Sequence, residues 1–520
     1  MSSLQEQDRT GPDQRRWPER PASSRGADAI PTVLVPADRR RGRVAVWLSR
    51  HPAWPVTALL AGYPLWWAIG VADFMWIMLA IPMAWRMLGW HMARSRPLRM
   101  PPGFGLWLVF LLWTAASLVM ITYPAPGTVQ SPVSHRLVAY GDRTASYLAI
   151  TVLFLYVVNL TESEFPRRKL AWLLGLLGIY TVALGLAGIL LPAVQFTSPL
   201  LAFVPNALRN NAFILAQMRP ALTQLQDVFG TVTYQGRPKA PFNYTNTWGE
   251  SLTITVPWLL LVCQSAGRRS LRYLGWGTLL LALVALVYSL NRGAWIATAF
   301  AAFYLAARLA ARGRVAILGA LISVVVLLGV VVVVSPLGSI ITLRLQNGQS
   351  NAIRSSLFAL SLRDGIASPI LGYGDTRQQR GSPLSIAVGP TPGCPVCGNA
   401  AVGSTGQASL LLVCTGFVGL FLYCAFFART AWRFRRAKSP YGWIGLLVIL
   451  MSFIYIFTYD AVTAPLGLTM LACALLWRDD MDRSQQGAIE KAVQMPRPRR
   501  FAIRAIEAAG TAPEATASAT

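Results

Sequence analysis

Two arginines expected at helix ends are the side chains of this sequence best suited to chemistry. Arg292 lies in segment 289–295, a tight turn between two apolar stretches, and Arg354 lies in the first turn of an amphipathic helix predicted over 351–360. A guanidinium group binds two phosphate oxygens at once, which a lysine ammonium cannot do. Two interpretations are therefore open for both residues: an arginine at the level of the lipid headgroups, or a ligand-binding arginine for phosphate.

Carboxyl groups are few in the segments that share a side with these arginines, and two of them are candidate catalytic groups. Glu250 falls at the start of a predicted helix, where a negative charge is favoured, and it is a candidate general base. Asp364 follows Arg363 beyond the 351–360 helix. These two residues could form a surface ion pair that adds little stability. Alternatively, they belong to the site, where Asp364 would act as a general base and Arg363 would bind the substrate. The acids expected on this side are Asp142, Asp227, Glu250, Asp364, Asp375 and Asp460.

A polar and aromatic cluster precedes Glu250. Asn246 and Trp248 combine an amide with an aromatic face, as a rim that contacts a sugar would. The same residues are equally typical of a helix cap and an aromatic anchor at the membrane interface. We keep both interpretations and include Asn246 and Trp248 among the candidate substrate-binding residues.

Cys394 and Cys397 form a Cys-x-x-Cys pair in a polar segment. Such a pair is half of a zinc site, a redox pair or a local disulfide. Because no histidine lies nearby to complete four zinc ligands, we favour a disulfide and predict no metal site. No cofactor is expected either.

The composition determines the class of protein. Apolar residues make up 54% of the 520 residues and charged residues only 13%, whereas soluble proteins carry about a quarter charged residues. Many apolar stretches are long enough to cross a bilayer as helices. We therefore predict an all-α polytopic membrane protein and exclude soluble enzymes and secreted disulfide scaffolds. The formal net charge of +26 lies mostly between apolar stretches, so we expect no nucleic-acid partner.

About twelve membrane-spanning helices are predicted, near 54–71, 74–91, 105–121, 145–160, 170–191, 250–265, 273–289, 293–310, 316–335, 406–427, 442–459 and 462–477. Residues 1–50 and 481–520 are polar and biased in composition, and we expect both to be disordered tails that flank a transmembrane domain over 51–480.

Every second connection between these helices is basic, which predicts that these connections and both tails face the cytoplasm, in the cytoplasmic (inner) membrane. Two long loops, 192–249 and 336–404, then face outward. Loops of this length are typically functional or disordered. Their mixture of Pro, Gly, aromatic and Arg residues favours function.

Four segments, taken in order, resemble the O-antigen ligase and polymerase superfamily of bacterial integral-membrane glycosyltransferases. They are an aromatic and Asn-rich segment at 241–249, the Ser-Leu-Asn-Arg-Gly-Ala-Trp turn at 289–295, Arg354 followed by a Pro-Ile-Leu-Gly-Tyr-Gly turn at 369–374, and Gly403–Gln407 followed by Gly-Phe-Val-Gly at 416–419. The resemblance covers roughly residues 50–480. The Arg- and Trp-rich composition is typical of an actinobacterial member.

The resemblance implies a function and roles for residues. Members of the family transfer a glycan from a polyprenyl diphosphate to an acceptor glycan or lipid at the outer face of the membrane, without a metal. By this likeness Arg292 and Arg354 bind the diphosphate, and Gln407 at the end of the long loop contacts the substrate. The partners expected are the lipid-linked glycan, the acceptor and the bilayer.

One departure from the family concerns the acceptor. Its ligases carry a histidine eleven residues before Gly-x-x-Gly, and Thr405 stands there in this sequence. Another group, such as Glu250 or Asp364, must then activate the acceptor, which favours a polymerase or a divergent transferase. Two alternatives stay open: a transporter or flippase of lipid-linked sugars, which also fits twelve spans, and a non-catalytic scaffold for envelope assembly.

Overall fold

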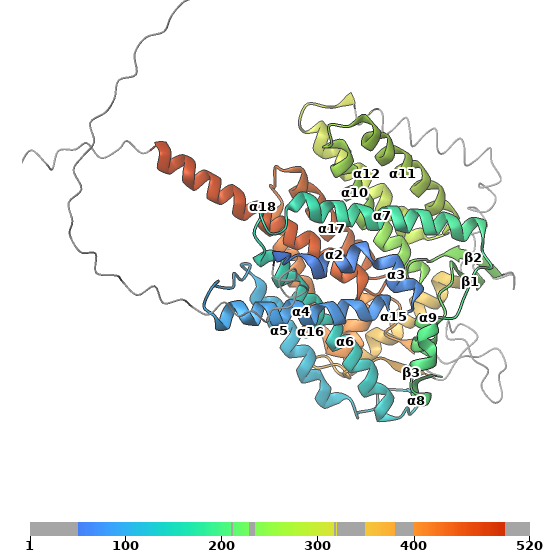
Figure 1. Ribbon diagram of the computed structural model, residues 1–520. Coiled ribbons are helices and arrows are strands. Elements are labelled where there is room, and N and C mark those ends of the chain that lie inside the picture. Colours follow the sequence, from blue (N-terminus) through green and yellow to red (C-terminus); the bar gives the residue numbers. More distant parts are fainter. Residues whose placement is uncertain are drawn as a thin grey trace, which may run out of the picture. The chain divides into compact units, whose positions relative to one another are not determined.

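A computed structural model describes residues 50–209, 212–227, 234–316, 319, 349–379 and 400–494. This part of the chain is mostly helical (Figure 1). The longer helices are α4 (Ala72–Met92), α5 (Phe104–Ala116), α6 (Val133–Asn159), α7 (Arg167–Leu190), α10 (Thr245–Gln264), α11 (Arg269–Tyr288), α12 (Arg292–Ala310), α15 (Gln349–Ala367), α16 (Gln407–Phe434), α17 (Pro440–Tyr455) and α18 (Ala464–Gln494). The short ones are α2 (Trp54–Ala61), α3 (Tyr63–Ala68), η1 (Ser117–Met120), η2 (Pro199–Phe203), α8 (Asn206–Arg209) and α9 (Ala212–Met218).

Five described helices are long and apolar enough to cross a membrane: α6, α7, α11, α12 and α16. Two further apolar helices, Phe104–Met120 and α17, are shorter. These helices agree with the predicted membrane protein, but they do not confirm twelve spans. The predicted span 316–335 lies almost wholly outside the described residues, as do residues 1–49 and 495–520.

Three helix boundaries differ from the prediction. The expected span 54–71 is two short helices, α2 and α3, because the chain bends at Gly62 and Pro64 has no N–H to continue the helix. Helix α6 begins at Val133 instead of residue 145, so two arginines of its first half lie within a helix. Helix α18 continues to Gln494, past the expected tail boundary at 481, because this stretch is rich in residues that favour helices.

The prediction of an all-α fold missed two small antiparallel sheets. Strands β1 (Thr223–Asp227) and β2 (Tyr234–Pro238) pair within the first long loop. Strands β3 (Arg377–Gln379) and β4 (Ala400–Val402) pair within the second. Sequence periodicity does not reveal strands of three to five residues in segments without alternating apolar residues.

Helix α10 lies at the centre of the bundle. It packs against α7, α11, α12, α17 and α18. Its side chains are buried on almost every face, and Trp248 and Trp258 are fully enclosed. The start of α10 therefore offers a rigid base for the loops that meet there.

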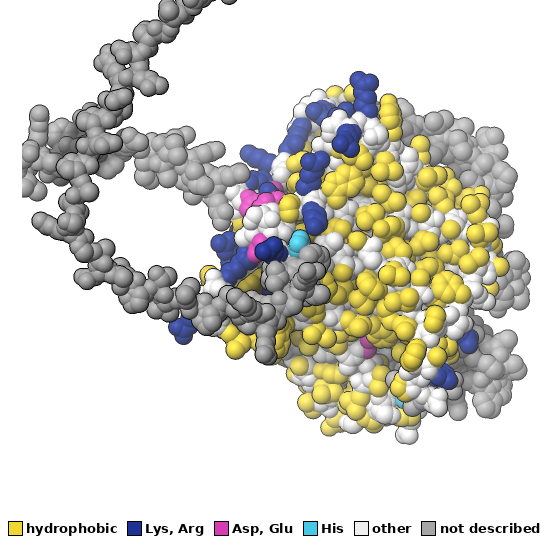
Figure 2. Space-filling model, viewed as in Figure 1, with side chains coloured by type: hydrophobic (Ala, Val, Ile, Leu, Met, Phe, Trp, Pro, Cys, Tyr) yellow, Lys and Arg dark blue, Asp and Glu magenta, His cyan; other side chains and the backbone are white. Residues whose placement is uncertain are grey.

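The basic connections gather at one end of the bundle, which we call the basic end. Arg96 bonds Glu164, and Arg433 bonds Asp480. Further hydrogen bonds link Arg167 to Asp479 and Arg308 to the carbonyl of Arg435. Figure 2 shows most Lys and Arg side chains of this view near the end where α18 leaves the bundle, beside a broad hydrophobic face. The clustering follows the positive-inside pattern.

Buried arginines hold the loops at the opposite end. Arg143 bonds the carboxylate of Asp375 at 2.8 Å, with both side chains buried. Arg377 is almost fully buried and donates to the carbonyl groups of five residues, Ile121, Tyr123, Tyr373, Asp375 and Thr376. These hydrogen bonds connect the segment after η1 with the turn after α15. They therefore fix the position of the end of α15 relative to the segment after η1.

Replacing Arg377 with alanine should lower the stability of the fold strongly. The substitution leaves five carbonyl groups without this donor, and we expect a loss of about 3 kcal/mol or more. A thermal-denaturation assay on detergent-purified protein would measure it, with the exposed Arg269→Ala as the matched control. An unchanged melting temperature for Arg377→Ala would contradict this role.

Candidate functional site

The turn before α12 is built to hold Arg292 at the helix start. Asn291 is the N-cap, and its side-chain oxygen accepts a hydrogen bond from the N–H of Ala294 at 3.1 Å. Its amide nitrogen donates to the carbonyl of Thr245 at 3.3 Å. Leu290 adopts a left-handed φ of 52°, which is unfavourable for a residue with a branched side chain. Such strain recurs where a functional group must be positioned.

Tyr459 packs directly against this turn. Its hydroxyl donates a hydrogen bond to the side-chain oxygen of Asn291. A Cβ atom at Gly293 would lie 2.5 Å from that hydroxyl, so only glycine fits between Arg292 and the tyrosine. The Arg-Gly pair of the predicted turn therefore has a steric reason.

Arg354 reaches the same place from α15. Its Nη1 donates to the carbonyl of Thr458 at 2.8 Å, and its guanidinium carbon lies 5.8 Å from the ring centre of Tyr459. The charge of Arg354 acts electrostatically on Arg292. Two like charges held together, both half-buried, are costly unless an anion lies between them.

A third arginine, which the sequence analysis missed, supports this turn. Arg237 on β2 is buried and donates from Nε to the carbonyl of Ser289 at 2.6 Å. Its charge also acts on Tyr459. We call Arg237, Arg292 and Arg354 the arginine cluster. Arg237 lies in a segment whose sequence has no recognisable motif. The pairing of β1 with β2 places it beside the turn that carries Arg292.

Asp460 is a second residue that we did not select as catalytic. It follows Tyr459 in the sequence. Its side chain is accessible to solvent, but many protein atoms lie around the carboxyl group and displace part of its water. This partial desolvation raises its pKa to about 7, although the charges of Arg354 and Arg143 act in the opposite direction. A carboxyl group with such a pKa is suited to take a proton at neutral pH.

Gln407 holds the segment that carries Asp460. Its backbone N–H donates to the carbonyl of Tyr459 at 2.9 Å, and its side-chain oxygen accepts from the N–H of Ala461 at 2.9 Å. Its amide nitrogen donates to Tyr147 at 3.0 Å. Because Gln407 is buried, with both amide atoms engaged, the structure gives it a positioning role rather than the substrate contact that we predicted.

Glu250 lies one helical turn into α10 and is buried. One carboxyl oxygen has no hydrogen-bond partner in the described part of the chain. The charge of Asp460 acts on it electrostatically. Glu250 therefore belongs to the site, but it lies deeper than Asp460.

Asp364 and Arg363 do not join the arginine cluster. They pair at 3.1 Å, with Asp364 fully buried and Arg363 partly exposed, and Arg363 also donates to the carbonyl of Pro126. Burial raises the pKa of Asp364, and the Arg363 guanidinium opposes this only in part. Asp364 lies ten residues beyond Arg354 on α15, which corresponds to about 15 Å along the helix. The pair fixes α15 against the neighbouring loop.

Two further predicted residues lie at the start of α10. Trp248 is fully buried, and its indole N–H donates to the carbonyl of Thr181 at 3.0 Å. Helix α7 approaches closely at Gly185 and covers the ring, which fits the anchoring interpretation of Trp248 rather than the sugar-contacting one. Asn246 is half-buried. Cys394 and Cys397, with the predicted disulfide, lie outside the described residues.

The comparison with known families bears directly on the segment that supplies Arg292 and Arg354. Residues 277–393 match the family model described as O-Antigen ligase. This match confirms the predicted resemblance. No curated protein matches the chain. The matched O-antigen ligase region begins within α11, includes the arginine turn, α15 and β3, and ends at residue 393, outside the described residues. It supports a membrane glycosyltransferase of the ligase or polymerase kind.

Proposed function

We propose that this protein transfers a glycan from a polyprenyl-diphosphate carrier to an acceptor glycan or lipid at the outer face of the cytoplasmic membrane. The observation that carries the proposal is that the turn bearing Arg292 and the guanidinium of Arg354 both lie beside Tyr459. Both arginines lie within the region that matches the O-antigen ligases. In this orientation the basic end faces the cytoplasm, with both termini on that side.

The arginine cluster would hold the diphosphate of the donor. Transfer breaks the bond between the anomeric carbon and a diphosphate oxygen, so negative charge develops on the leaving group. Fixed guanidinium groups near a low-dielectric boundary stabilise that charge more than water does. The hydrogen bonds of Asn291 and Thr458 hold the cations in place before the substrate binds.

Asp460 would act on the acceptor. A sugar hydroxyl is a weak nucleophile, and a base that accepts its proton as the new glycosidic bond forms speeds the reaction. The proton moves to the Asp460 carboxylate, and the electron pair of the broken bond leaves with the diphosphate. Asp460 thus takes the role of the histidine that Thr405 replaces; Thr405 is buried and bonds Ser409.

Deletion of the gene followed by analysis of lipid-linked intermediates tests the proposal. Glycan units attached to the polyprenyl diphosphate should accumulate at the outer leaflet, because the step that consumes them is lost. Accumulation confined to the inner leaflet would instead indicate a flippase, and unchanged levels would contradict both functions.

Glu250→Gln separates the two carboxyl candidates. Glu250 is buried, whereas Asp460 is exposed, so we expect turnover to stay within about tenfold of the unmodified protein, well short of the loss of a direct base. The measurement is the rate of glycan transfer by protein reconstituted in vesicles. A loss of about a hundredfold or more would make Glu250 the base.

A further inference from the structure

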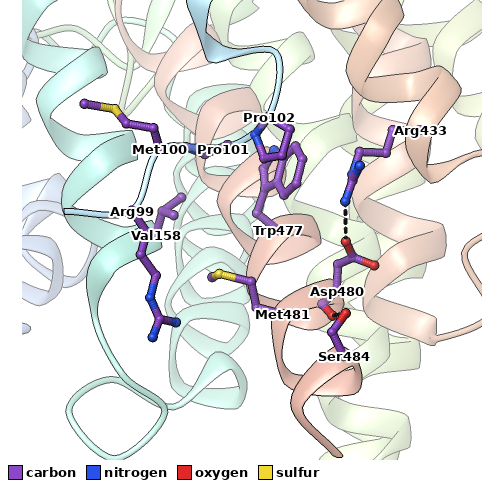
Figure 3. A pocket seen from close by; sticks show the side chains of 10 residues that line it. All are labelled: Arg99, Met100, Pro101, Pro102, Val158, Arg433, Trp477, Asp480, Met481 and Ser484. Carbon is purple, nitrogen blue, oxygen red and sulfur yellow. Dashed lines mark hydrogen bonds and ion pairs between the residues drawn. The ribbon is translucent and has the colours of Figure 1, made fainter. Parts of the chain in front are cut away.

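The basic end contains a pocket of about 320 Å³, and Figure 3 shows the residues that line it. Four segments line it: the residues before α5, the last residues of α6, the last residues of α16, and the middle of α18. Most of its walls are apolar, from Met100, Pro101, Pro102, Val158, Trp477 and Met481. Its polar side chains are Arg99, Arg433, Asp480 and Ser484.

The pocket lies at the level where membrane-crossing helices end. Val158 is one residue from the end of α6, and Arg433 is one residue from the end of α16. Both helices are candidate membrane spans. The apolar walls therefore adjoin the hydrocarbon region, and the charged side chains adjoin the headgroups.

The charges of the pocket leave one positive charge in excess. Arg433 is paired with Asp480 at 3.0 Å, and its guanidinium lies 4.7 Å from the ring centre of Trp477, which fixes its position. Arg99 is exposed, and its backbone is held by Asn159 at 2.7 Å. Among the described residues, the guanidinium of Arg99 has no ion-pair partner.

We propose that this pocket binds the headgroup of an anionic phospholipid. The phosphate would lie beside the guanidinium of Arg99, and the first carbons of the acyl chains would contact Met100, Val158 and Met481. A small soluble anion would gain nothing from the apolar walls, whereas a lipid uses both kinds of contact. Basic pockets between transmembrane helices are a recurrent site for such headgroups.

Native mass spectrometry of the detergent-purified full chain tests the site, with phosphatidylglycerol and phosphatidylcholine as competing probes. We expect phosphatidylglycerol to be retained preferentially. Arg99→Ala should weaken its retention about fivefold, because one cation near the headgroup is lost. This variant keeps the pair between Arg433 and Asp480. Arg269→Ala, an exposed arginine at the start of α11, is the matched control and should retain the lipid.

A second measurement uses the unmodified protein and does not depend on folding of a variant. Raising the salt concentration from about 0.05 M to about 0.5 M should reduce retention of phosphatidylglycerol, because salt screens charges near the surface. Equal retention of the two lipids, indifference to salt, or unchanged retention by Arg99→Ala would each overturn the proposal. None of these results bears on glycan transfer at the other end.

Discussion

Replacing Arg292 or Arg354 with alanine is expected to lower glycan transfer by about 10³-fold, while the protein stays folded in the membrane. Each substitution removes one of the cations that would stabilise the leaving diphosphate. Arg292→Lys keeps the positive charge but loses the bidentate hydrogen bonds to phosphate, so we expect an intermediate loss of glycan transfer, of about tenfold or more. The measurement is polymer formation in cells, followed by turnover in reconstituted vesicles.

Arg269→Ala is the matched control for these variants, because Arg269 is exposed at the start of α11, away from the turn that carries Arg292. Membrane levels of every variant must be equal for the comparison. Normal polymer from a well-expressed Arg354→Ala would remove the diphosphate role, and normal polymer from Arg292→Lys would count against bidentate binding.

Replacing Asp460 with asparagine should cost about 10²–10⁴-fold in turnover, because asparagine cannot accept the acceptor's proton. The unmodified protein should also show a pH dependence that follows this carboxyl group. Its pKa of about 7 means that the base is protonated and inactive below that pH. The rate should therefore rise as the pH rises through about 7 and then level off.

Asp142→Asn is the control for this prediction, since Asp142 is a half-buried carboxyl group on α6 at the same end of the molecule. We expect it to keep both the rate and the pH profile. A flat profile in the unmodified protein, or an Asp460→Asn variant that retains the profile, would assign the base to another group.

The sequence predicts the membrane class well, and it predicts the tight turn that carries Arg292, because both signals are local. Apolar length predicts helices that can cross a bilayer, and the Arg-Gly pair at 292–293 follows from a turn that leaves no room for a side chain beside Tyr459. The helix predicted around Arg354 is also confirmed, as part of α15.

The rest of the site depends on contacts between distant segments. Arg237 reaches the turn only through a small sheet, and Asp460 reaches the arginines only because Gln407 and Tyr459 hold its segment. Trp248 is covered by α7, which the residues around it do not indicate. Sequence spacing alone therefore pointed to Arg292 and Arg354, but it could not indicate that Arg237 and Asp460 lie near the same turn.

A double-mutant cycle on ligand binding tests most directly whether Arg292 and Arg354 hold one diphosphate. Affinity for farnesyl diphosphate, a short polyprenyl diphosphate, would be measured by calorimetry for the unmodified protein, Arg292→Ala, Arg354→Ala and the double variant. Joint binding predicts that the loss in the double variant differs from the sum of the single losses by about 1 kcal/mol or more. Losses that add within about 0.3 kcal/mol would mean that the two arginines act independently, and would contradict the shared site.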